Sequence, residues 1–281
     1  MSDGADSVRA TEPADGMGPG PVAGAAPASG AGSTAGAGST AGAGSTAGAG
    51  STAGAGSTTS AGSTAGAVYP KGDLSLDPLD GAAAVVDYLG DRYPAVRAFG
   101  SLLAEQGELR GLIGPRELGR IWERHLLNSA AVVPFLSDGV LVDVGSGAGL
   151  PGLVIAAMEP QRRIVLVEPM ERRTAWLREA AEILGMVNVT VVRGRAEEVR
   201  EVVEADVITA RAVASIDKLV KWSLPLLSDT GRMALLKGRS AGEELDKAKY
   251  VLRRAGLVGE VHSAPTVPGL EATTVVTLSR A

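Results

Sequence analysis

The chain has 281 residues and a formal net charge of −5, with no cysteine and two histidines. The absence of cysteine excludes disulfides, thiolate metal sites and cysteine nucleophiles, and two histidines are too few for a histidine-rich metal site, so no metal is expected. The N-terminus has no signal-peptide pattern, and no uncharged run approaches the roughly 20 residues that span a bilayer. We therefore expect a cytoplasmic protein with no membrane partner.

The first 67 residues are dominated by small side chains. From about Gly30 to Ala65 a six-residue unit, Gly-Ala-Gly-Ser-Thr-Ala, repeats, and the segment before it is equally poor in large apolar residues. This composition cannot bury enough surface to offset the entropy of ordering the chain, so residues 1–67 are predicted to be a disordered tail. The tail contains four carboxylates and one arginine, which leaves a net charge of −2 for residues 68–281. A nucleic-acid partner would therefore have to bind a local basic patch.

Residues 68–136 follow as a predicted helical cap. Apolar residues recur at helical spacing in "AAAVVDYLGDRYPAVRAFGSLLAEQG" and again in "IWERHLLNSAAVVPFL". The whole of 79–136 is predicted to be helical, and these helices are expected to pack on or beside the domain that follows.

Residues 137–281 alternate between predicted strands and helices. Strands are predicted at 140–144, 164–168, 189–193, 205–210, 232–237, 257–263 and 273–278. The first runs are continuously apolar, which is typical of parallel strands buried on both faces. Helices are predicted over 170–185, 215–227 and 241–256, two of them closed by glycine C-caps. The alternation indicates an α/β fold with a parallel sheet, and the "APTVPG" link makes the last two strands a hairpin with one antiparallel strand.

A glycine-rich loop after the first strand fits two templates. In "VLVDVGSGAGLPGLVIA" (140–156), the frame from Gly147 reads G-x-G-x-x-G, as in dinucleotide-binding proteins, and the frame from Gly145 reads G-x-G-x-G, as in S-adenosylmethionine-binding proteins. The strand stays β-competent up to Val144, so the turn is expected to begin at Gly145. Glycines at 145, 147 and 149 let the backbone turn tightly and approach a ligand, and Gly152 then lets the next helix pack close to the strand.

Two carboxylates near this loop indicate a nucleoside ligand. Glu168 ends the second strand, 19 residues after Gly149, where a carboxylate can reach the two hydroxyls of a ribose. Both templates share such an acid. Asp143 lies two residues before Gly145, where a carboxylate can hold loop amides or meet a cationic ligand. A pyrophosphate would be repelled there and a sulfonium would not, which favours S-adenosylmethionine.

Five stretches in order then carry a family resemblance: "LVDVGSGAGLPGLVIA", "VEPMERRTAWLREAAEILG", "GRAEEV", "TARAVAS" and "LLKG". Over roughly residues 80–280 the chain resembles the RsmG (GidB) family, which methylates N7 of a guanine in 16S ribosomal RNA. The resemblance implies a class I S-adenosylmethionine-dependent methyltransferase fold, Rossmann-like, with a seven-stranded sheet whose last strand is antiparallel. One departure is that the Trp-Asn…Asn-Leu-Thr stretch of many members is replaced here by "ELRGLIGPRELGRIWERHLLNS".

The same resemblance implies site residues and partners. Gly145 and Leu150 would line the methionine and sugar part of the pocket, Ala196 and Glu197 would flank the adenine, and Arg211 would sit at the mouth. The partner would be 16S ribosomal RNA or the small ribosomal subunit particle, and we expect the protein to act as a monomer. The complete set of expected cofactor-binding residues is Asp143, Gly145, Gly147, Gly149, Leu150, Glu168, Ala196, Glu197 and Arg211.

Substrate contacts are expected from basic residues around the mouth, and no catalytic base is expected because guanine N7 has a free lone pair and no proton to remove. Arg124, His125 and Lys237 are the substrate-positioning candidates, because they match family motifs. The remaining basic candidates are Arg116, Arg120, Arg172, Arg173 and Arg239.

Three other functions remain open on the sequence. A class I methyltransferase for another substrate would share the whole cofactor half, and a non-catalytic S-adenosylmethionine or RNA-binding module would share it too. An NAD-dependent dehydrogenase would use the second glycine frame, but no His/Tyr/Lys acid-base constellation accompanies that frame.

Overall fold

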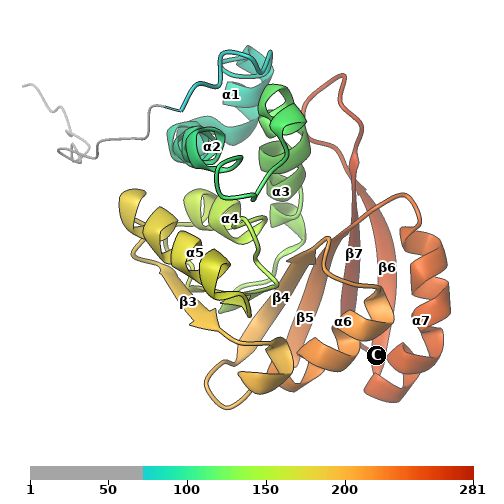
Figure 1. Ribbon diagram of the computed structural model, residues 1–281. Helices are drawn as coiled ribbons and strands as arrows, with labels where there is room; N and C mark the ends of the chain where they lie inside the picture. The colour runs from blue at the N-terminus through green and yellow to red at the C-terminus, as the bar shows by residue number, and fades with distance from the viewer. Residues whose placement is uncertain (1–71) are drawn as a thin grey trace, which may run out of the picture. The chain divides into compact units, whose positions relative to one another are not determined.

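The computed structural model describes residues 72–281 (Figure 1), so the predicted tail over 1–67 lies outside the described residues. Seven strands form one sheet in the order β3-β2-β1-β4-β5-β7-β6, with β7 antiparallel to both neighbours. The predicted α/β fold with an antiparallel last strand is therefore confirmed. The strands are β1 Leu141–Val144, β2 Ile164–Glu168, β3 Val189–Arg193, β4 Ala205–Arg211, β5 Leu227–Lys237, β6 Leu257–Ala264 and β7 Thr273–Arg280.

The central strands are buried on both faces, as their continuous apolar runs predict. Every residue of β1 and β2 is buried, and successive side chains alternate between two core clusters, Leu141 on one face and Val142 on the other. β3 is only partly buried because it lies at the edge of the sheet, where one side has no neighbouring strand.

Helices cover both faces of the sheet. Helices α4 (Gly152–Met158) and α5 (Glu171–Ile183) pack on the first face, and α6 (Ile216–Ser223) and α7 (Ala241–Ala255) pack on the second. Gly256 closes α7 with a left-handed φ of 63°, as predicted for a C-cap. The predicted helix over 215–227 is too long. The observed helix α6 ends at Ser223, shortly before Pro225, which cannot continue an α-helix. Strand β5 then begins at Leu227, five residues earlier than predicted.

The cap consists of α1 (Ala83–Leu89), α2 (Tyr93–Gln106) and α3 (Asn128–Ala130), with a 3-10 helix over Pro115–Arg120 and a π-helix over Trp122–Leu127. The prediction that the whole of 79–136 is helical is wrong for 79–82, which precede α1, and for the segment 107–114, which forms turns. Gly111 has a φ of 62°, a conformation that an α-helix cannot contain. This non-helical segment passes over the functional site described below.

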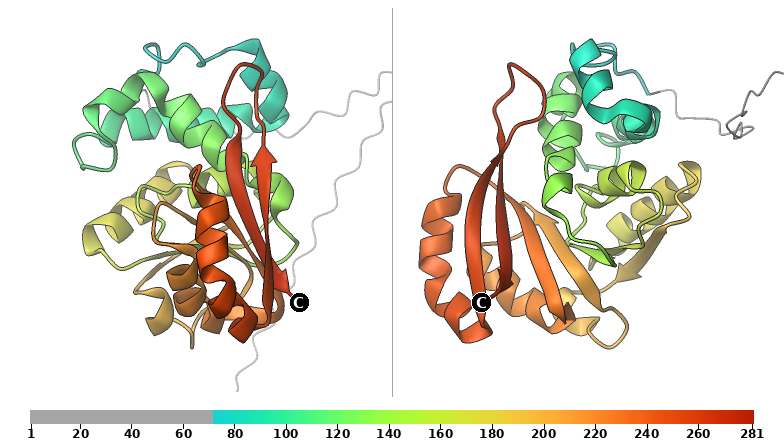
Figure 2. Two further views of the ribbon diagram at one scale, coloured as in Figure 1. Left: turned by 90° about the vertical axis from the view of Figure 1, so that its right-hand side faces the viewer. Right: turned by 180° about the vertical axis from the view of Figure 1, so that it is seen from behind.

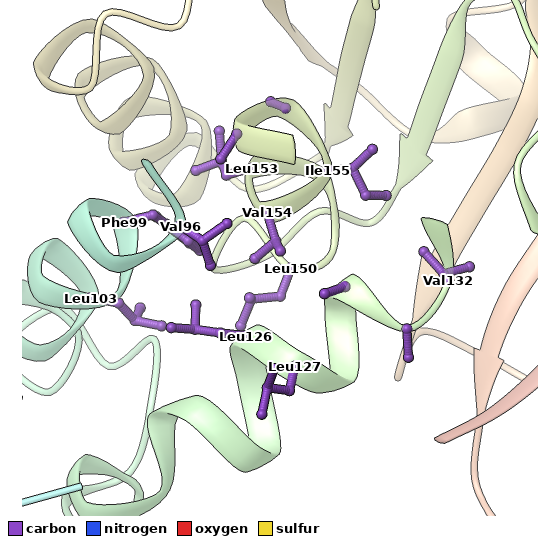
Figure 3. Packing of buried hydrophobic residues seen from close by; sticks show 14 of the residues in the cluster. Val96, Phe99, Leu103, Leu126, Leu127, Val132, Leu150, Leu153, Val154 and Ile155 are labelled. Atoms are coloured by element: carbon purple, nitrogen blue, oxygen red, sulfur yellow. The ribbon is translucent and has the colours of Figure 1, made fainter. Parts of the chain in front are cut away.

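The cap packs through its apolar face onto α4 (Figure 3). Phe99 and Leu103 of α2, with Leu126 and Leu127 of the π-helix, lie in the same core cluster as Leu153 of α4. Phe99 is fully buried, and truncating such a side chain to alanine typically costs about 3–5 kcal/mol. The cap and the first face of the sheet therefore share one continuous core.

The β6–β7 hairpin also reaches the cap. Both views of Figure 2 show its loop beside the cap helices, and Asn128 Nδ2 donates to Thr273 Oγ1 at 3.0 Å. None of the helices within residues 72–281 is long and apolar enough to cross a membrane.

Candidate functional site

The glycine loop begins at Gly145, directly after β1, which is the frame that the strand length predicts. Gly145, Gly147 and Gly149 have φ values of 73°, 55° and 96°, so all three lie in the region that favours glycine. A Cβ at Gly149 would overlap Leu153, whereas a Cβ at Gly147 would meet no atom closer than 3.7 Å. The space above Gly147 is therefore open to a ligand.

Gly152 has a packing role, as the sequence predicts. It is the first residue of α4, and a Cβ there would overlap Leu166 and lie 2.7 Å from Asp143 Oδ2. The helix can approach the strand this closely because no side chain separates them.

Asp143 lies beneath the loop. Its side chain is fully buried, Oδ2 accepts a hydrogen bond from the Gly152 amide at 3.0 Å, and Oδ1 has no hydrogen-bond partner within residues 72–281. Burial raises the pKa of this carboxyl to about 7. The structure displays neither predicted role: the amide that Asp143 binds belongs to the first residue of α4, directly after the loop. Asp143 is not among the residues that line the hollow above the loop.

A hollow of about 390 Å³, here called the glycine-loop hollow, lies above the loop. It is lined by Leu112, Ile113, His125, Gly145, Ser146, Gly147, Ala148, Leu150, Glu168, Pro169, Met170, Arg173, Arg211, Ala212 and Val213. Five of the predicted cofactor-binding residues line this hollow: Gly145, Gly147, Leu150, Glu168 and Arg211. Gly149, Ala196 and Glu197 do not line it. Ala196 is buried in the second-face core, and Glu197 is exposed at the start of a 3-10 turn.

Glu168 is placed to act on a ligand and on the loop at once. Its side chain is almost fully buried, Oε2 accepts from the Gly147 amide at 3.0 Å, and Oε1 accepts from the Met170 amide at 3.0 Å. Arg173 Nη1 lies 3.9 Å from Oε2. Met170 and Arg173 line the same hollow and are absent from the predicted cofactor-binding set, although their place directly after Glu168 was a usable signal.

The cap segment 107–114 forms one wall of this hollow through Leu112 and Ile113. Arg110 anchors the segment, donating to both Glu179 oxygens of α5 at 2.7 and 2.8 Å while its guanidinium lies 5.2 Å from the Trp176 ring centroid. Trp176 Nε1 in turn donates to the carbonyl of Ala148 in the glycine loop at 3.0 Å. One indole therefore links the cap segment to the loop, and sequence reasoning did not find this contact.

Arg211, at the end of β4, ties the sheet to the cap. It donates to the Arg124 carbonyl at 2.9 Å and to Asn128 Oδ1 at 3.1 Å, and its Nη2 lies 3.3 Å from His125 Nδ1. Burial lowers the pKa of Arg211 to about 10. Burial also lowers the pKa of His125 to about 4, with the charge of Arg211 acting in the same direction.

A second hollow of about 870 Å³, here called the cationic hollow, adjoins the first. It is lined by Arg120, Glu123, Arg124, His125, Asn128, Arg211, Ala212, Leu236, Lys237, Gly238, Arg239, Ser240, Glu244, Glu271, Ala272, Thr273 and Thr274. The two hollows share His125, Arg211 and Ala212. Ala212 has a φ of 55°, a conformation that costs a non-glycine residue about 1–3 kcal/mol and is concentrated at functional sites.

Most cations of this hollow have a carboxylate partner. The pairs, with their N···O distances, are Arg120–Glu123 at 2.9 Å, Arg124–Glu117 at 3.4 Å, Lys237–Glu244 at 2.7 Å and Arg239–Glu271 at 3.1 Å. Arg211 has no carboxylate within ion-pair distance among the described residues, so it carries the unneutralised positive charge where the hollows meet. The predicted substrate-positioning residues Arg124, His125 and Lys237 all line this hollow.

The other predicted basic residues are distributed differently. Arg120 and Arg239 line the cationic hollow, Arg173 lines the glycine-loop hollow, and Arg116 and Arg172 are exposed and line neither. Within residues 72–281, no group of three or more His, Asp and Glu side chains is placed to hold a metal ion.

The sheet order with an antiparallel β7, the glycine loop after β1 and the acid that ends β2 together define a class I methyltransferase fold. The model of the family described as rRNA small subunit methyltransferase G (GidB) matches residues 92–264. The chain belongs to this family.

Individual proteins show the same relationship. A protein of Bifidobacterium longum (strain DJO10A) named ribosomal RNA small subunit methyltransferase G is 44% identical over 218 residues, which are 73% of this chain and 99% of that protein. A protein of Leifsonia xyli subsp. xyli (strain CTCB07) with the same name is 52% identical over 181 residues, 63% of this chain and 87% of that protein. Among solved structures, a precorrin-6y C5,15-methyltransferase from Geobacter metallireducens GS-15 is similar, with a TM-score of 0.44, 17% identity and coverage of 60% of this chain and 90% of that one.

Proposed function

We propose that this protein transfers the methyl group of S-adenosylmethionine to N7 of a guanine in 16S ribosomal RNA. The observation that carries the proposal is the junction of the two hollows at His125, Arg211 and Ala212. A cofactor above the glycine loop and a nucleotide in the cationic hollow would meet there, and family membership supplies the class of substrate.

The residues of the glycine-loop hollow fit the cofactor. Gly147 leaves open space, and Glu168 presents a buried carboxylate at the end of β2, where it can accept hydrogen bonds from two ribose hydroxyls. Leu150 offers an apolar contact, and the segment with Leu112 and Ile113 excludes water from one side. Bound S-adenosylmethionine would supply an electrophilic methyl group on a sulfonium.

The residues of the junction suit a reaction that needs no base. Guanine N7 has a free lone pair, so the protein must position the base and balance charge rather than remove a proton. His125 does not fit the role of a base for two reasons. Its pKa of about 4 makes the ring a weak base, and Nδ1 already accepts from Arg211. Methylation of pyrimidine C5 normally requires a cysteine nucleophile, and the chain has no cysteine.

We further propose that the protein acts as a monomer in the cytoplasm, where ribosomal RNA or the small ribosomal subunit particle is its partner. The large apolar side chains that the described surface exposes most, such as Leu109, Val187 and Tyr250, lie on separate elements and support no large docking face. Light scattering of the purified protein tests the monomer directly, and a stable dimer would contradict it.

The decisive experiment is methyl transfer from labelled S-adenosylmethionine to small-subunit ribosomal RNA taken from cells that lack the modification. Naked RNA and intact particles should be compared, and the labelled base should be identified by chemical cleavage at N7-methylguanine. A Gly147→Asp variant provides the background. Label on another base or on protein would show a methyltransferase of different specificity. Binding of the cofactor without any transfer would show a binding module, and tight binding of NAD alone would reject the glycine-loop assignment.

A further inference from the structure

One ion pair of the cationic hollow differs from the others in its burial. Lys237 ends β5 and Glu244 lies in the first turn of α7, and their Nζ and Oε2 atoms are 2.7 Å apart. The Lys237 and Glu244 side chains are 10% and 24% exposed, whereas those of Arg239 and Glu271 are 88% and 69% exposed. Lys237 Nζ also donates to the Ala214 carbonyl at 2.8 Å, which fixes the ammonium in place.

Stability alone gives little reason for this pair. Removing two charges from water costs free energy that their attraction often fails to return, and apolar residues of similar volume frequently stabilise a fold more. Glu244 Oε2 is buried and, within residues 72–281, makes no hydrogen bond of good geometry. This burial closes Oε2 to a ligand, so Glu244 can accept hydrogen bonds in the hollow that it lines only through the two lone pairs of Oε1.

The pair presents the Lys237 ammonium as a donor beside Glu244 Oε1, a single oxygen with two lone pairs. Guanine alone among the four RNA bases presents the reverse on its Watson–Crick edge, with the O6 acceptor beside the N1–H and N2–H₂ donors. The Lys237 ammonium can donate to O6 while the Glu244 carboxylate accepts from N1–H and N2–H₂. N7 lies on the other side of O6, so this mode of binding leaves the N7 lone pair free.

The charge of the pair also suits the proposed reaction. In the transfer, the N7 lone pair forms the new bond to carbon, the electron pair of the broken C–S bond stays on sulfur, and one positive charge moves from sulfur to the purine. No proton is transferred. A carboxylate that accepts from N1–H is bound more strongly as the ring becomes positive, which favours the transition state over the ground state.

We infer that Glu244, held by Lys237, is the guanine-reading residue of this enzyme and accepts hydrogen bonds from N1 and N2 of the target base. The inference rests on the proposed function. It predicts that the enzyme rejects a target whose N2 amino group is missing, because the carboxylate would then lose one of its two donors.

The test compares ribosomal RNA that contains guanine or inosine at the target position, since inosine lacks only the N2 amino group. The wild-type enzyme should lose about 10- to 100-fold in kcat/KM with inosine. Glu244→Gln should be slower than wild type with guanine and should discriminate between the two bases only a few-fold. Glu243→Gln is the matched control, because Glu243 lies in the same turn of α7, is 77% exposed and pairs with Lys247 outside the hollow.

The outcomes separate the two proposals. A wild-type enzyme that methylates no guanine N7 overturns the proposed function and this inference together. A wild-type enzyme that methylates guanine and inosine at equal rates overturns the inference alone, and this result needs no variant to fold. A Glu244→Gln variant that keeps the full discrimination also overturns it, because the ion pair would then have only a structural role.

Discussion

Arg211 Nη2 lies 3.3 Å from His125 Nδ1, and this contact fixes the protonation of the imidazole. A guanidinium can only donate, so Nδ1 must accept and the proton of the neutral ring must lie on Nε2. Nε2 faces Glu117 Oε2 at 3.1 Å. The neutral His125 ring thus lies between an arginine from the sheet and a glutamate from the cap.

His125 should make the stability of the fold depend on pH. Its pKa is lowered from 6.5 to about 4 in the folded protein, so between these values the unfolded chain binds a proton that the folded chain does not. The contribution of His125 to the free energy of unfolding therefore falls as the pH drops through this window. His125→Asn keeps an acceptor near the position of Nδ1 but does not titrate. The free energy of unfolding of this variant, relative to that of wild type, should rise by about 2–3 kcal/mol as the pH falls from 7.5 to 4.5. Urea unfolding at the two pH values measures this change.

Asp143 should make the stability of the fold depend on pH in the opposite direction, over an overlapping pH range. Its pKa is raised from 3.8 to about 7, so between these values the folded chain keeps a proton that the unfolded chain has lost, and stability falls as the pH rises. Relative to wild type, Asp143→Asn should therefore gain stability from pH 4.5 to pH 7.5, the reverse of His125→Asn. A difference from wild type that is constant with pH in both variants would contradict both assignments.

Local signals account for what the sequence predicted well. The strand runs and the glycine frame were predictable because apolar burial and positive φ each act within a few residues, as the loop from Gly145 to Gly149 demonstrates. The position of Asp143 beneath the loop was predictable from its place in the strand, but its bond to Gly152 at the start of α4 was not. Helical spacing failed over 107–114 because apolar spacing does not reveal the left-handed conformation of Gly111.

Contacts between distant parts of the chain could not be predicted in this way. Arg110 and Glu179 are 69 positions apart, and Arg211 meets cap residues more than 80 positions earlier. Their side chains come together only after the cap has packed on α4. The pairing of Lys237 with Glu244 needs the exact turn between β5 and α7. The sequence therefore predicted the cations of the site but not the partners that neutralise them.

Substitutions at Gly147 and Gly152 should separate an effect on ligand binding from an effect on folding. Gly147→Asp adds bulk and a negative charge in open space, at a residue whose amide already donates to Glu168 Oε2. We expect S-adenosylmethionine binding to be lost in calorimetry while the melting temperature falls by only a few degrees. Gly152→Ala provides the contrast, because its Cβ would overlap Leu166 and should destabilise the fold. Retained cofactor binding by Gly147→Asp would show that the ligand does not approach this loop.

Arg110 should influence cofactor affinity without touching the glycine loop. Its pair with Glu179 is partly exposed, with side chains 31% and 45% accessible, so the ion pair and the Trp176 contact together contribute about 1 kcal/mol. Arg110→Ala should loosen the wall that contains Leu112 and Ile113 and weaken S-adenosylmethionine binding about 3- to 10-fold. Arg178→Ala is the control, because Arg178 is exposed on α5 next to Glu179, the partner of Arg110. An unchanged dissociation constant for Arg110→Ala would show that the wall does not depend on this anchor.

Replacing Arg124 should weaken RNA binding, whereas replacing Lys237 should lower the rate of methyl transfer. The Arg124 side chain is 51% exposed and its carboxylate partner is 3.4 Å away, so it is free to exchange that partner for an RNA phosphate. Arg124→Ala should weaken binding of any RNA and reduce the salt dependence of binding by about one unit of slope, with cofactor affinity nearly unchanged. Lys237 is 10% exposed and fixed by Glu244 and the Ala214 carbonyl, so it is poorly placed to neutralise backbone phosphates.

Lys237→Ala should instead lower the rate at saturating RNA, because a residue that positions the base acts after the RNA has bound. The variant also leaves Glu244 without its cation, so a fall in melting temperature is expected and must be separated from the effect on the rate. The double variant Lys237→Gln with Glu244→Gln removes both charges together and should restore most of the lost stability without restoring the rate. If the double variant recovers both, Lys237 serves only to neutralise Glu244. If Lys237→Ala instead changes the salt dependence of RNA binding as Arg124→Ala does, the two cations share a phosphate-binding role.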